Sequence, residues 1–388
     1  MNQSFREKIA EKPRILIAPL DWGLGHATRC IPIIRELLAQ NCDVWLAGEG
    51  AQEHLLKTEF PELPFLQLPG YRIKYARTQR GLIWKMIQQG PKMRRAIQYE
   101  HRWLKKMTKQ HHFDAVISDN RYGLYHSAIP CIFITHQLTI KSSLAKWTEK
   151  ILQKRNYRYI NKFTACWVPD LPAGQAGVKG ENNLAGELSH PEINPAVPVH
   201  YIGFLSRFKR NSVSENKNNL LIVLSGPEPQ RSMLEEKIIN EISEYNYTAT
   251  IVRGLPGVAS LIPSTNRIQF YNHLSSGDLN AVMQEAEYVI SRSGYSTVMD
   301  IIALQKKAIL IPTPGQTEQE YLGNYLMKKG MAICIAQKDF SLQEALAAAV
   351  VYQYELPAML SSPPLSATIE TFLMSISLST KNKSILKP

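Results

Sequence analysis

The stretch SRSGYSTVMDIIALQKKAILIPTPGQTEQEYLGN, residues 291–324, decides the fold of the C-terminal half of this 388-residue chain. The apolar run EYVI leads into it and predicts a strand that ends near Ser291, a tight turn at Gly294 and a helix from about Ser296. A second apolar run, residues 308–314, is followed by another helical stretch. Strands that alternate with helices indicate a parallel sheet, and ligands of such sheets lie at the carboxyl ends of the strands.

Polar residues follow both strands at the edge where such a ligand would lie. The backbone N–H groups and hydroxyls of Ser296 and Thr297 suit a diphosphate, and Asp300, one helical turn later, suits the hydroxyls of a ribose. Gln319 and Glu320 begin the next helix and suit sugar hydroxyls, which need donors and acceptors. The alternative is that the first two residues only cap their helix and the last two are ordinary solvated residues.

The same alternation extends over the rest of the chain. Short apolar runs predict strands within residues 15–20, 43–48, 65–70, 114–119, 131–136, 165–170, 219–226, 248–254, 267–274, 287–294 and 308–314. Residues 205–219 are polar and lack apolar periodicity, which is typical of an interdomain linker. We predict an α/β fold of two Rossmann-like domains with a cleft between them. The predicted parts are an N-terminal domain at 1–205, a linker at 206–218, a C-terminal domain at 219–365, and a helix and tail at 366–388. That last helix either completes the second domain or crosses back to the first.

Composition narrows the functional classes. Residues 1–210 hold 31 Lys and Arg against 17 Asp and Glu, whereas residues 211–388 hold 14 against 16, so the N-terminal half is the one expected to meet an anionic partner. The five cysteines show no metal-ligand spacing and are expected to be reduced. Because the N-terminus is charged and has no apolar core, we expect no secretory signal there, and no apolar run approaches the roughly 18 residues that span a bilayer. We expect a cytoplasmic protein, or one attached to the inner face of the cell membrane at its surface.

Residues 291–324 resemble the C-terminal signature of the GT-B glycosyltransferases, most closely that of the peptidoglycan N-acetylglucosaminyltransferase family, which acts on a lipid-linked muramyl acceptor. The resemblance implies that the turn at Ser293 and Gly294, with the helix start at Ser296 and Thr297, binds the diphosphate of a UDP-sugar. It also implies that Asp300 binds the ribose, and that Gln319 and Glu320 bind the sugar. Two residues depart from the family pattern: Asp300 replaces a Glu, and Glu320 replaces a second Gln. The latter change leaves the donor sugar open.

The resemblance implies further donor contacts upstream. VLSGPEPQR, residues 223–231, stands where the family has a Gly-Gly-Ser loop on the phosphates, and Ser225 and Gly226 keep part of that loop. Arg231 is expected to supply positive charge there, with a solvated arginine as the alternative. Backbone groups near Tyr271 are expected to contact a uracil.

A second candidate motif is LDWGLGHATR, residues 20–29. As a phosphate loop it is incomplete, and a lone histidine after a strand is more often structural. The same family, however, has a Gly-rich turn ending in Gly-His here, so the resemblance implies that His26 is the catalytic base, with Asp119 as the acid that orients it. The alternative for the acid is a turn residue at the end of its strand. Gly23, Gly25 and His136 are expected to line the acceptor side of the cleft.

Residues 71–109 carry twelve Lys and Arg, one acid and interleaved aromatic residues. Three interpretations compete: a solvated helical face, a nucleic-acid site, or a surface that lies on an anionic membrane. A basic face for a soluble glycan or small acceptor is a further alternative. We favour the membrane, because the implied acceptor is lipid-linked, and expect no nucleic-acid partner.

The sequence therefore predicts an inverting glycosyltransferase that moves a sugar, favoured to be an N-acetylhexosamine, from a UDP-sugar to a cell-envelope glycan, glycolipid or lipid-linked acceptor. No two aspartates are separated by a single residue, so a DxD metal site is absent, and we expect no metal or other cofactor. A nucleotide-sugar epimerase of the same fold and a non-catalytic nucleotide-sugar-binding subunit are the alternatives.

Overall fold

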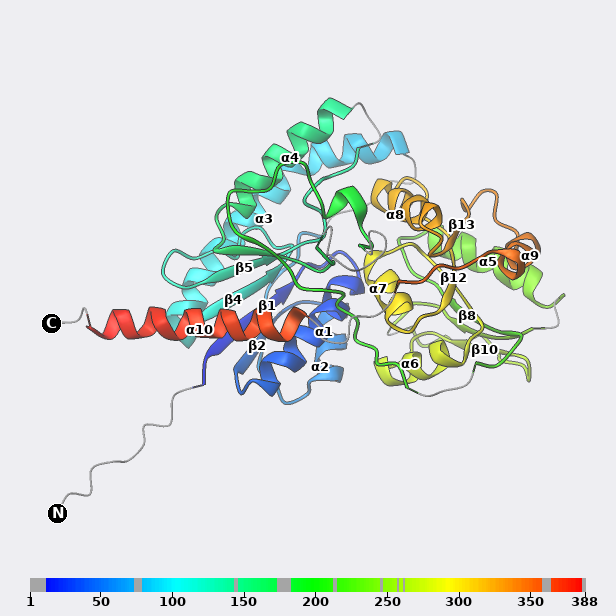
Figure 1. Ribbon diagram of the computed structural model, residues 1–388, viewed down its shortest axis with the longest axis horizontal. Coiled ribbons are helices and arrows are strands. Elements are labelled where there is room, and N and C mark those ends of the chain that lie inside the picture. The colour runs from blue at the N-terminus through cyan, green and yellow to red at the C-terminus, as the bar shows by residue number, and fades with distance from the viewer. Residues whose placement is uncertain are drawn as a thin grey trace, which may run out of the picture.

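The computed structural model describes residues 12–72, 79–142, 146–172, 183–211, 215–244, 247–256, 258–260, 262–357 and 364–385. Within these ranges the chain forms two parallel α/β units that lie beside each other (Figure 1). No described helix is long and apolar enough to cross a membrane.

The N-terminal sheet has seven parallel strands in the order β3-β2-β1-β4-β5-β6-β7. The strands are β1 (Arg14–Pro19), β2 (Asp43–Gly48), β3 (Phe65–Gln67), β4 (Ala115–Asp119), β5 (Cys131–Ile134), β6 (Ala165–Val168) and β7 (Val199–Tyr201). Most of their residues are buried, because helices cover both faces of the sheet. The helices of this unit are α1 (Leu24–Ala39), α2 (Ala51–Glu59), α3 (Gln79–His111) and α4 (Lys146–Ile160), with a short 3-10 turn at Gly186–Leu188.

The C-terminal sheet repeats this plan with six strands in the order β10-β9-β8-β11-β12-β13. The strands are β8 (Asn219–Val223), β9 (Thr248–Val252), β10 (Ile268–Tyr271), β11 (Tyr288–Ser291), β12 (Lys307–Leu310) and β13 (Ile333–Cys334). The helices are α5 (Gln230–Ile242), α6 (Ser276–Glu285), α7 (Tyr295–Ala303), α8 (Thr317–Lys328) and α9 (Leu342–Val351). The predicted strand end at Ser291 and the helix start after Gly294 are both confirmed.

The last helix, α10 (Pro364–Ile385), returns to the N-terminal unit (Figure 1). Ser366 Oγ donates to Glu36 Oε1 of α1 at 2.8 Å, and the rings of Phe372 and Trp167 in β6 pack in a T-shaped arrangement with centroids 5.4 Å apart. Phe372 and Ile376 are buried there, so α10 shields apolar side chains of the N-terminal core.

Candidate functional site

Each sheet reverses its strand order beside its first strand, which opens a crevice between diverging loops at the carboxyl ends of the strands. In the N-terminal sheet the reversal lies between β1 and β4, so the Gly-His turn after β1 lies near Asp119, the last residue of β4. In the C-terminal sheet it lies between β8 and β11, which brings the loop at Ser225 and Gly226 near the turn at Ser293 and Gly294. Both candidate motifs therefore stand where α/β sheets bind ligands.

The Gly-His turn meets the donor motif directly. Gly23 has a φ of 82°, which a residue with a side chain rarely adopts, and α1 begins at the next residue, so His26 lies in the first turn of the helix. Ser296 Oγ, in the first turn of α7, donates to the carbonyl oxygen of Gly25 at 2.7 Å. A Cβ on Gly25 would lie 3.0 Å from that hydroxyl, so the glycine permits the close approach of the two domains.

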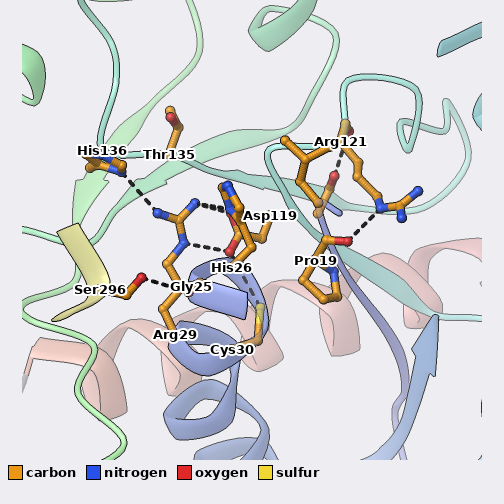
Figure 2. A network of polar contacts seen from close by, with 12 residues as sticks. Pro19, Gly25, His26, Arg29, Cys30, Asp119, Arg121, Thr135, His136 and Ser296 are labelled. Atoms are coloured by element: carbon orange, nitrogen blue, oxygen red, sulfur yellow. Dashed lines mark hydrogen bonds and ion pairs between the residues drawn. The ribbon is translucent and has the colours of Figure 1, made fainter. Parts of the chain in front are cut away.

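His26 and Asp119 are brought together as expected (Figure 2). His26 Nδ1 lies 3.0 Å from Asp119 Oδ1, and the carboxylate is fully buried. Burial by itself would raise the pKa of Asp119, but Arg29 and His26 outweigh it and hold that pKa well below its usual range. Burial lowers the pKa of His26 below its usual value, against the opposing effect of Asp119. The pair is therefore an ionised carboxylate beside a neutral imidazole, as a general base requires near pH 7.

Arg29, which we did not predict from the sequence, contacts both His26 and Asp119 (Figure 2). Its guanidinium is 2% exposed and makes a two-pronged ion pair with Asp119, of which the bond from Nε to Oδ2 measures 2.6 Å. Its Nη2 also lies 2.9 Å from His26 Nδ1. The signal was available, because Arg29 follows His26 by three residues on a helix, and that spacing places two side chains on one face.

His136, the expected second histidine of the cleft, lies on the far side of Arg29, where Arg29 Nη1 is 3.0 Å from His136 Nδ1. Its ring stacks on Tyr295 of α7, with centroids 4.1 Å apart. His136 Nε2 lies 2.7 Å from Glu318 Oε1 in the first turn of α8. Glu318 was also missed, although it immediately precedes the two residues that we singled out from the sequence.

The loop after β8 surrounds a second buried cation, which we did not predict. Arg292 is 1% exposed, and its guanidinium donates to backbone carbonyls, including that of Gln230 at 2.7 Å and that of Ile311 at 3.2 Å. Burial lowers its pKa to about 10, and no carboxylate among the described residues pairs with it. Gly226 has a φ of 100°, and a Cβ there would lie 3.2 Å from the Thr313 hydroxyl, which is buried and has no hydrogen-bond partner in the described part of the chain.

Arg231, the predicted source of charge at this loop, is engaged elsewhere. Its guanidinium lies 2.6 Å from a carboxylate oxygen of Glu228 and 3.1 Å from one of Glu235. Two acids therefore compensate its charge, and Arg292 is the uncompensated buried cation beside Ser225, whose carbonyl oxygen lies 3.5 Å from Arg292 Nε.

The start of α7 has no side-chain cap among the described residues. Gly294 is the residue before the helix and no side chain caps it, so the alternative that Ser296 and Thr297 cap the helix is wrong. An uncapped first turn leaves backbone N–H groups and a partial positive charge. Ser293 Oγ donates to the carbonyl oxygen of Gln319 at 2.7 Å, which ties this turn to the start of α8.

The remaining predicted donor residues hold contacts within the chain. Asp300 is buried, and Ser206, in the predicted linker, donates to its Oδ1 at 2.7 Å. Gln319 Oε1 accepts from the backbone N–H of Thr313 at 2.9 Å. Glu320 Oε1 accepts from the backbone N–H of Gly315, also at 2.9 Å. Tyr271, at the end of β10, is 38% exposed. It is Glu318, and not Glu320, whose carboxylate contacts a side chain of the N-terminal domain.

Known proteins resemble this chain most clearly in its C-terminal half. Residues 263–360 match the family model described as the glycosyltransferase family 28 C-terminal domain. A UDP-N-acetylglucosamine--N-acetylmuramyl-(pentapeptide) pyrophosphoryl-undecaprenol N-acetylglucosamine transferase of Methylobacterium radiotolerans is 39% identical over 87 residues, 22% of this chain and 23% of that protein. The protein of the same name from Prochlorococcus marinus is 27% identical over 139 residues, 33% of this chain and 36% of that protein. The predicted resemblance is confirmed, and the chain matches about a third or less of the length of these relatives.

The fold is similar over nearly the whole chain. The glycosyltransferase SnogD from Streptomyces nogalater has a TM-score of 0.59 at 11% identity, covering 94% of this chain and 100% of that chain. The spinosyn rhamnosyltransferase SpnG has a TM-score of 0.58 at 14% identity, covering 93% and 100%. At such low identity the likeness concerns the fold alone, and the predicted GT-B fold is confirmed.

Proposed function

We propose that this protein is an inverting, metal-independent glycosyltransferase that moves a sugar, favoured to be an N-acetylhexosamine, from a UDP-sugar to a lipid-linked or other cell-envelope acceptor. The observation that carries the proposal is the contact between Ser296 and Gly25, which brings the His26–Asp119 pair against the uncapped start of α7. The relatives are named for UDP-N-acetylglucosamine and an undecaprenol-linked acceptor, which supports these two substrate classes.

The chemistry follows from the His26–Asp119 geometry. When the protonated Nδ1 of His26 donates a hydrogen bond to Asp119, the lone pair on Nε2 is free to take the proton of an acceptor hydroxyl. The acceptor oxygen then attacks the anomeric carbon from the face opposite UDP. The bond from that carbon to the diphosphate oxygen breaks, UDP leaves with the electron pair, and the configuration inverts. The proton on His26 is afterwards released to solvent.

Fixed positive charge in the C-terminal domain supports departure of UDP without a metal. The first turn of α7 has no side-chain cap among the described residues, so its backbone N–H groups suit an anion, and Arg292 adds a buried cation that no described carboxylate neutralises. Such preorganised charge stabilises a developing anion more strongly in a buried site than in water. Within the described parts of the chain, no three His, Cys, Asp or Glu side chains gather as a metal site would require; metal independence stays a prediction.

UDP or a UDP-sugar is expected to raise the melting temperature of the protein in the presence of EDTA. A ligand that binds only the folded state adds about 2.7 kcal/mol at a concentration of 100 times its Kd. Thermal-shift measurements with UDP, UDP-N-acetylglucosamine, ADP and CMP check this, with the last two as controls for base recognition. If none of the nucleotides raises the melting temperature, the donor site is contradicted. If UDP raises it only after Mg²⁺ is added, metal independence is contradicted.

An anionic membrane surface is the partner that we propose for helices α3 and α4, which lie near each other (Figure 1). Met93 and Ala96 of α3 and Tyr159 of α4 pack against the same apolar cluster. In the predicted basic stretch 71–109, residues 73–78 and the side chains of 79–89 lie outside the described residues. The exposed cations of the rest of α3 are Lys92, Arg94, Arg95, Arg102, Lys105, Lys106 and Lys109. On α4, Trp147 is 64% and Ile151 is 56% exposed, among exposed lysines. Apolar side chains beside cations suit an anionic bilayer interface, and with a lipid-linked acceptor we place the protein at the cytoplasmic face.

The double variant Trp147→Ser/Ile151→Ser is expected to lose most binding to phosphatidylglycerol vesicles, because it removes the apolar side chains that enter the interface. Co-sedimentation with these vesicles, and with neutral phosphatidylcholine vesicles, measures the effect. Val350→Ser, which removes a 65% exposed apolar side chain from α9 of the other domain, is the matched control. Equal binding of both variants and the wild type would contradict the membrane surface.

A further inference from the structure

Five ionisable side chains meet at the junction of the two domains, and we call them the junction cluster: His26, Arg29, Asp119, His136 and Glu318. Four come from the N-terminal domain and appear together in Figure 2. The fifth, Glu318, is the only member from the C-terminal domain. The cluster holds one permanent cation, two carboxylates and two imidazoles, and the thiol of Cys30, whose pKa burial raises well above its usual value, also faces it, at 3.7 Å from Asp119.

The contacts of His136 determine which of its nitrogens carries the proton. Arginine only donates hydrogen bonds, so His136 Nδ1, at 3.0 Å from Arg29 Nη1, must accept. The proton of the neutral ring is then on Nε2, which donates to Glu318 Oε1 at 2.7 Å. Stacking on Tyr295 holds the ring in this orientation. His136 is thus a neutral bridge between the cation Arg29 and the anion Glu318.

His26 faces two competing partners through one nitrogen. Its Nδ1 lies 3.0 Å from an oxygen of Asp119 and 2.9 Å from Nη2 of Arg29. If Nδ1 carries the proton and donates to Asp119, the lone pair of Nε2 is free to act as a base. If Nδ1 accepts from Arg29, the proton moves to Nε2 and the ring has no lone pair left for the acceptor hydroxyl. Arg29 therefore opposes the tautomer that the reaction needs.

The second carboxylate of the cluster counters this effect. The charges of Arg29 and Asp119 cancel, so without Glu318 a proton on His26 would create a net positive charge in a buried site. Burial raises the pKa of Glu318, but the hydrogen bond from His136 and the neighbouring His26 and Arg29 outweigh it and hold that pKa below its usual value. The attraction is mutual, so Glu318 favours the protonated form of His26. Its negative charge also offsets part of the effect that the Arg29 cation has on His26.

We propose that Glu318 is a positioning residue of the catalytic base: acting through His136 and Arg29, it selects the active tautomer and strengthens the base. This inference rests on the proposed function of His26. Because Glu318 reaches the cluster from α8, the base is complete only when the two domains are in contact. Proton abstraction is thereby coupled to closure of the donor domain on the acceptor domain.

The inference is tested directly by NMR titration of protein with labelled histidine, with the His26 signal assigned from a His26→Gln variant. Glu318→Gln is expected to lower the pKa of His26 by about 1 unit, because it removes a nearby anion. His136→Phe keeps an aromatic ring against Tyr295 but breaks the bridge, so it should weaken the effect of Glu318 on the pKa of His26. The double variant should add little to either. Glu187→Gln is the matched control, because it also removes an acid, but one that pairs with Lys141 and lies outside the junction cluster. An unchanged pKa of His26 in Glu318→Gln would overturn the inference.

The pH dependence of kcat/KM gives an independent readout. In Glu318→Gln the acidic limb of the profile should move to lower pH by the same amount as the pKa of His26, and the plateau should fall because the base is weaker. A higher KM for the donor with an unmoved limb would mean that Glu318 only contacts the sugar, and would overturn the inference. If the wild type transfers no sugar, the proposed function fails, while the titration still decides whether Glu318 controls His26.

Discussion

Replacing His26 by alanine is expected to lower kcat by about 10²- to 10⁴-fold, the usual contribution of a positioned general base. The expectation follows from the 3.0 Å contact of His26 with a buried, ionised Asp119 at the crevice between β1 and β4. Because His26 belongs to the N-terminal domain, UDP binding to the C-terminal domain should persist. Steady-state rates with a UDP-sugar, together with thermal shift by UDP, measure the two effects separately.

His200→Ala is a suitable control, since His200 is exposed on the edge strand β7, outside the candidate site. It should leave both the rate and the UDP shift unchanged. A His26→Ala variant that transfers sugar at the wild-type rate would remove His26 as the base. One that loses both transfer and the UDP shift would indicate damage to the fold instead.

Replacing Arg29 by methionine is expected to lower the free energy of unfolding of the N-terminal domain by about 3–5 kcal/mol, because it leaves the fully buried carboxylate of Asp119 without its cation. All six tryptophans lie before residue 206, so tryptophan fluorescence during urea unfolding reports on this domain alone. Arg35→Met is the matched control on the same helix. The Arg35 side chain is 43% exposed and pairs with Glu59 at the surface, where such pairs contribute about 0–1 kcal/mol.

Two further measurements show whether the buried charge is the cause. The double variant Arg29→Met/Asp119→Asn has no unpaired carboxylate at position 119. Its loss in free energy of unfolding should therefore be smaller than the sum of the losses in the two single variants. Arg29 and His26 hold the pKa of Asp119 low, so its stabilising contribution is complete above pH of about 4 and declines as the pH falls below that value. Additive losses that do not change with pH would contradict this account.

Local patterns in the sequence were sufficient for the fold. Apolar runs of strand length ended where β11 ends, at Ser291, and Gly294 preceded α7 as its turn chemistry required. The fold also explains why His26 and Asp119 meet, since two loops at a strand-order reversal share one crevice. The positions of strands and turns depend on short-range rules, in which the residue type and its neighbours in the chain decide the local structure. The crevice that holds His26 and Asp119 follows from the order of those strands.

Local sequence patterns could not predict which groups the predicted donor residues contact. Asp300 contacts Ser206, 94 positions earlier, and the charge of Arg231 is compensated by two neighbouring acids. The buried cation at the loop after β8 is instead Arg292, and nothing in the sequence distinguishes it from an ordinary polar residue at the end of a strand. Burial and pairing depend on what packs against a side chain, and that information is spread over distant segments.

The stretch 291–324 by itself determined the strand-turn-helix succession of the C-terminal domain and its resemblance to nucleotide-sugar-binding domains, because hydrophobic period and turn residues act locally. Only the tertiary structure decided that Glu318, and not Glu320, faces the N-terminal domain and joins His136 and Arg29. The two glutamates stand in the same helical turn with the same chemistry. The direction of each carboxylate is set by the group that it meets in space: the backbone of its own loop for Glu320, and an imidazole 182 positions away for Glu318.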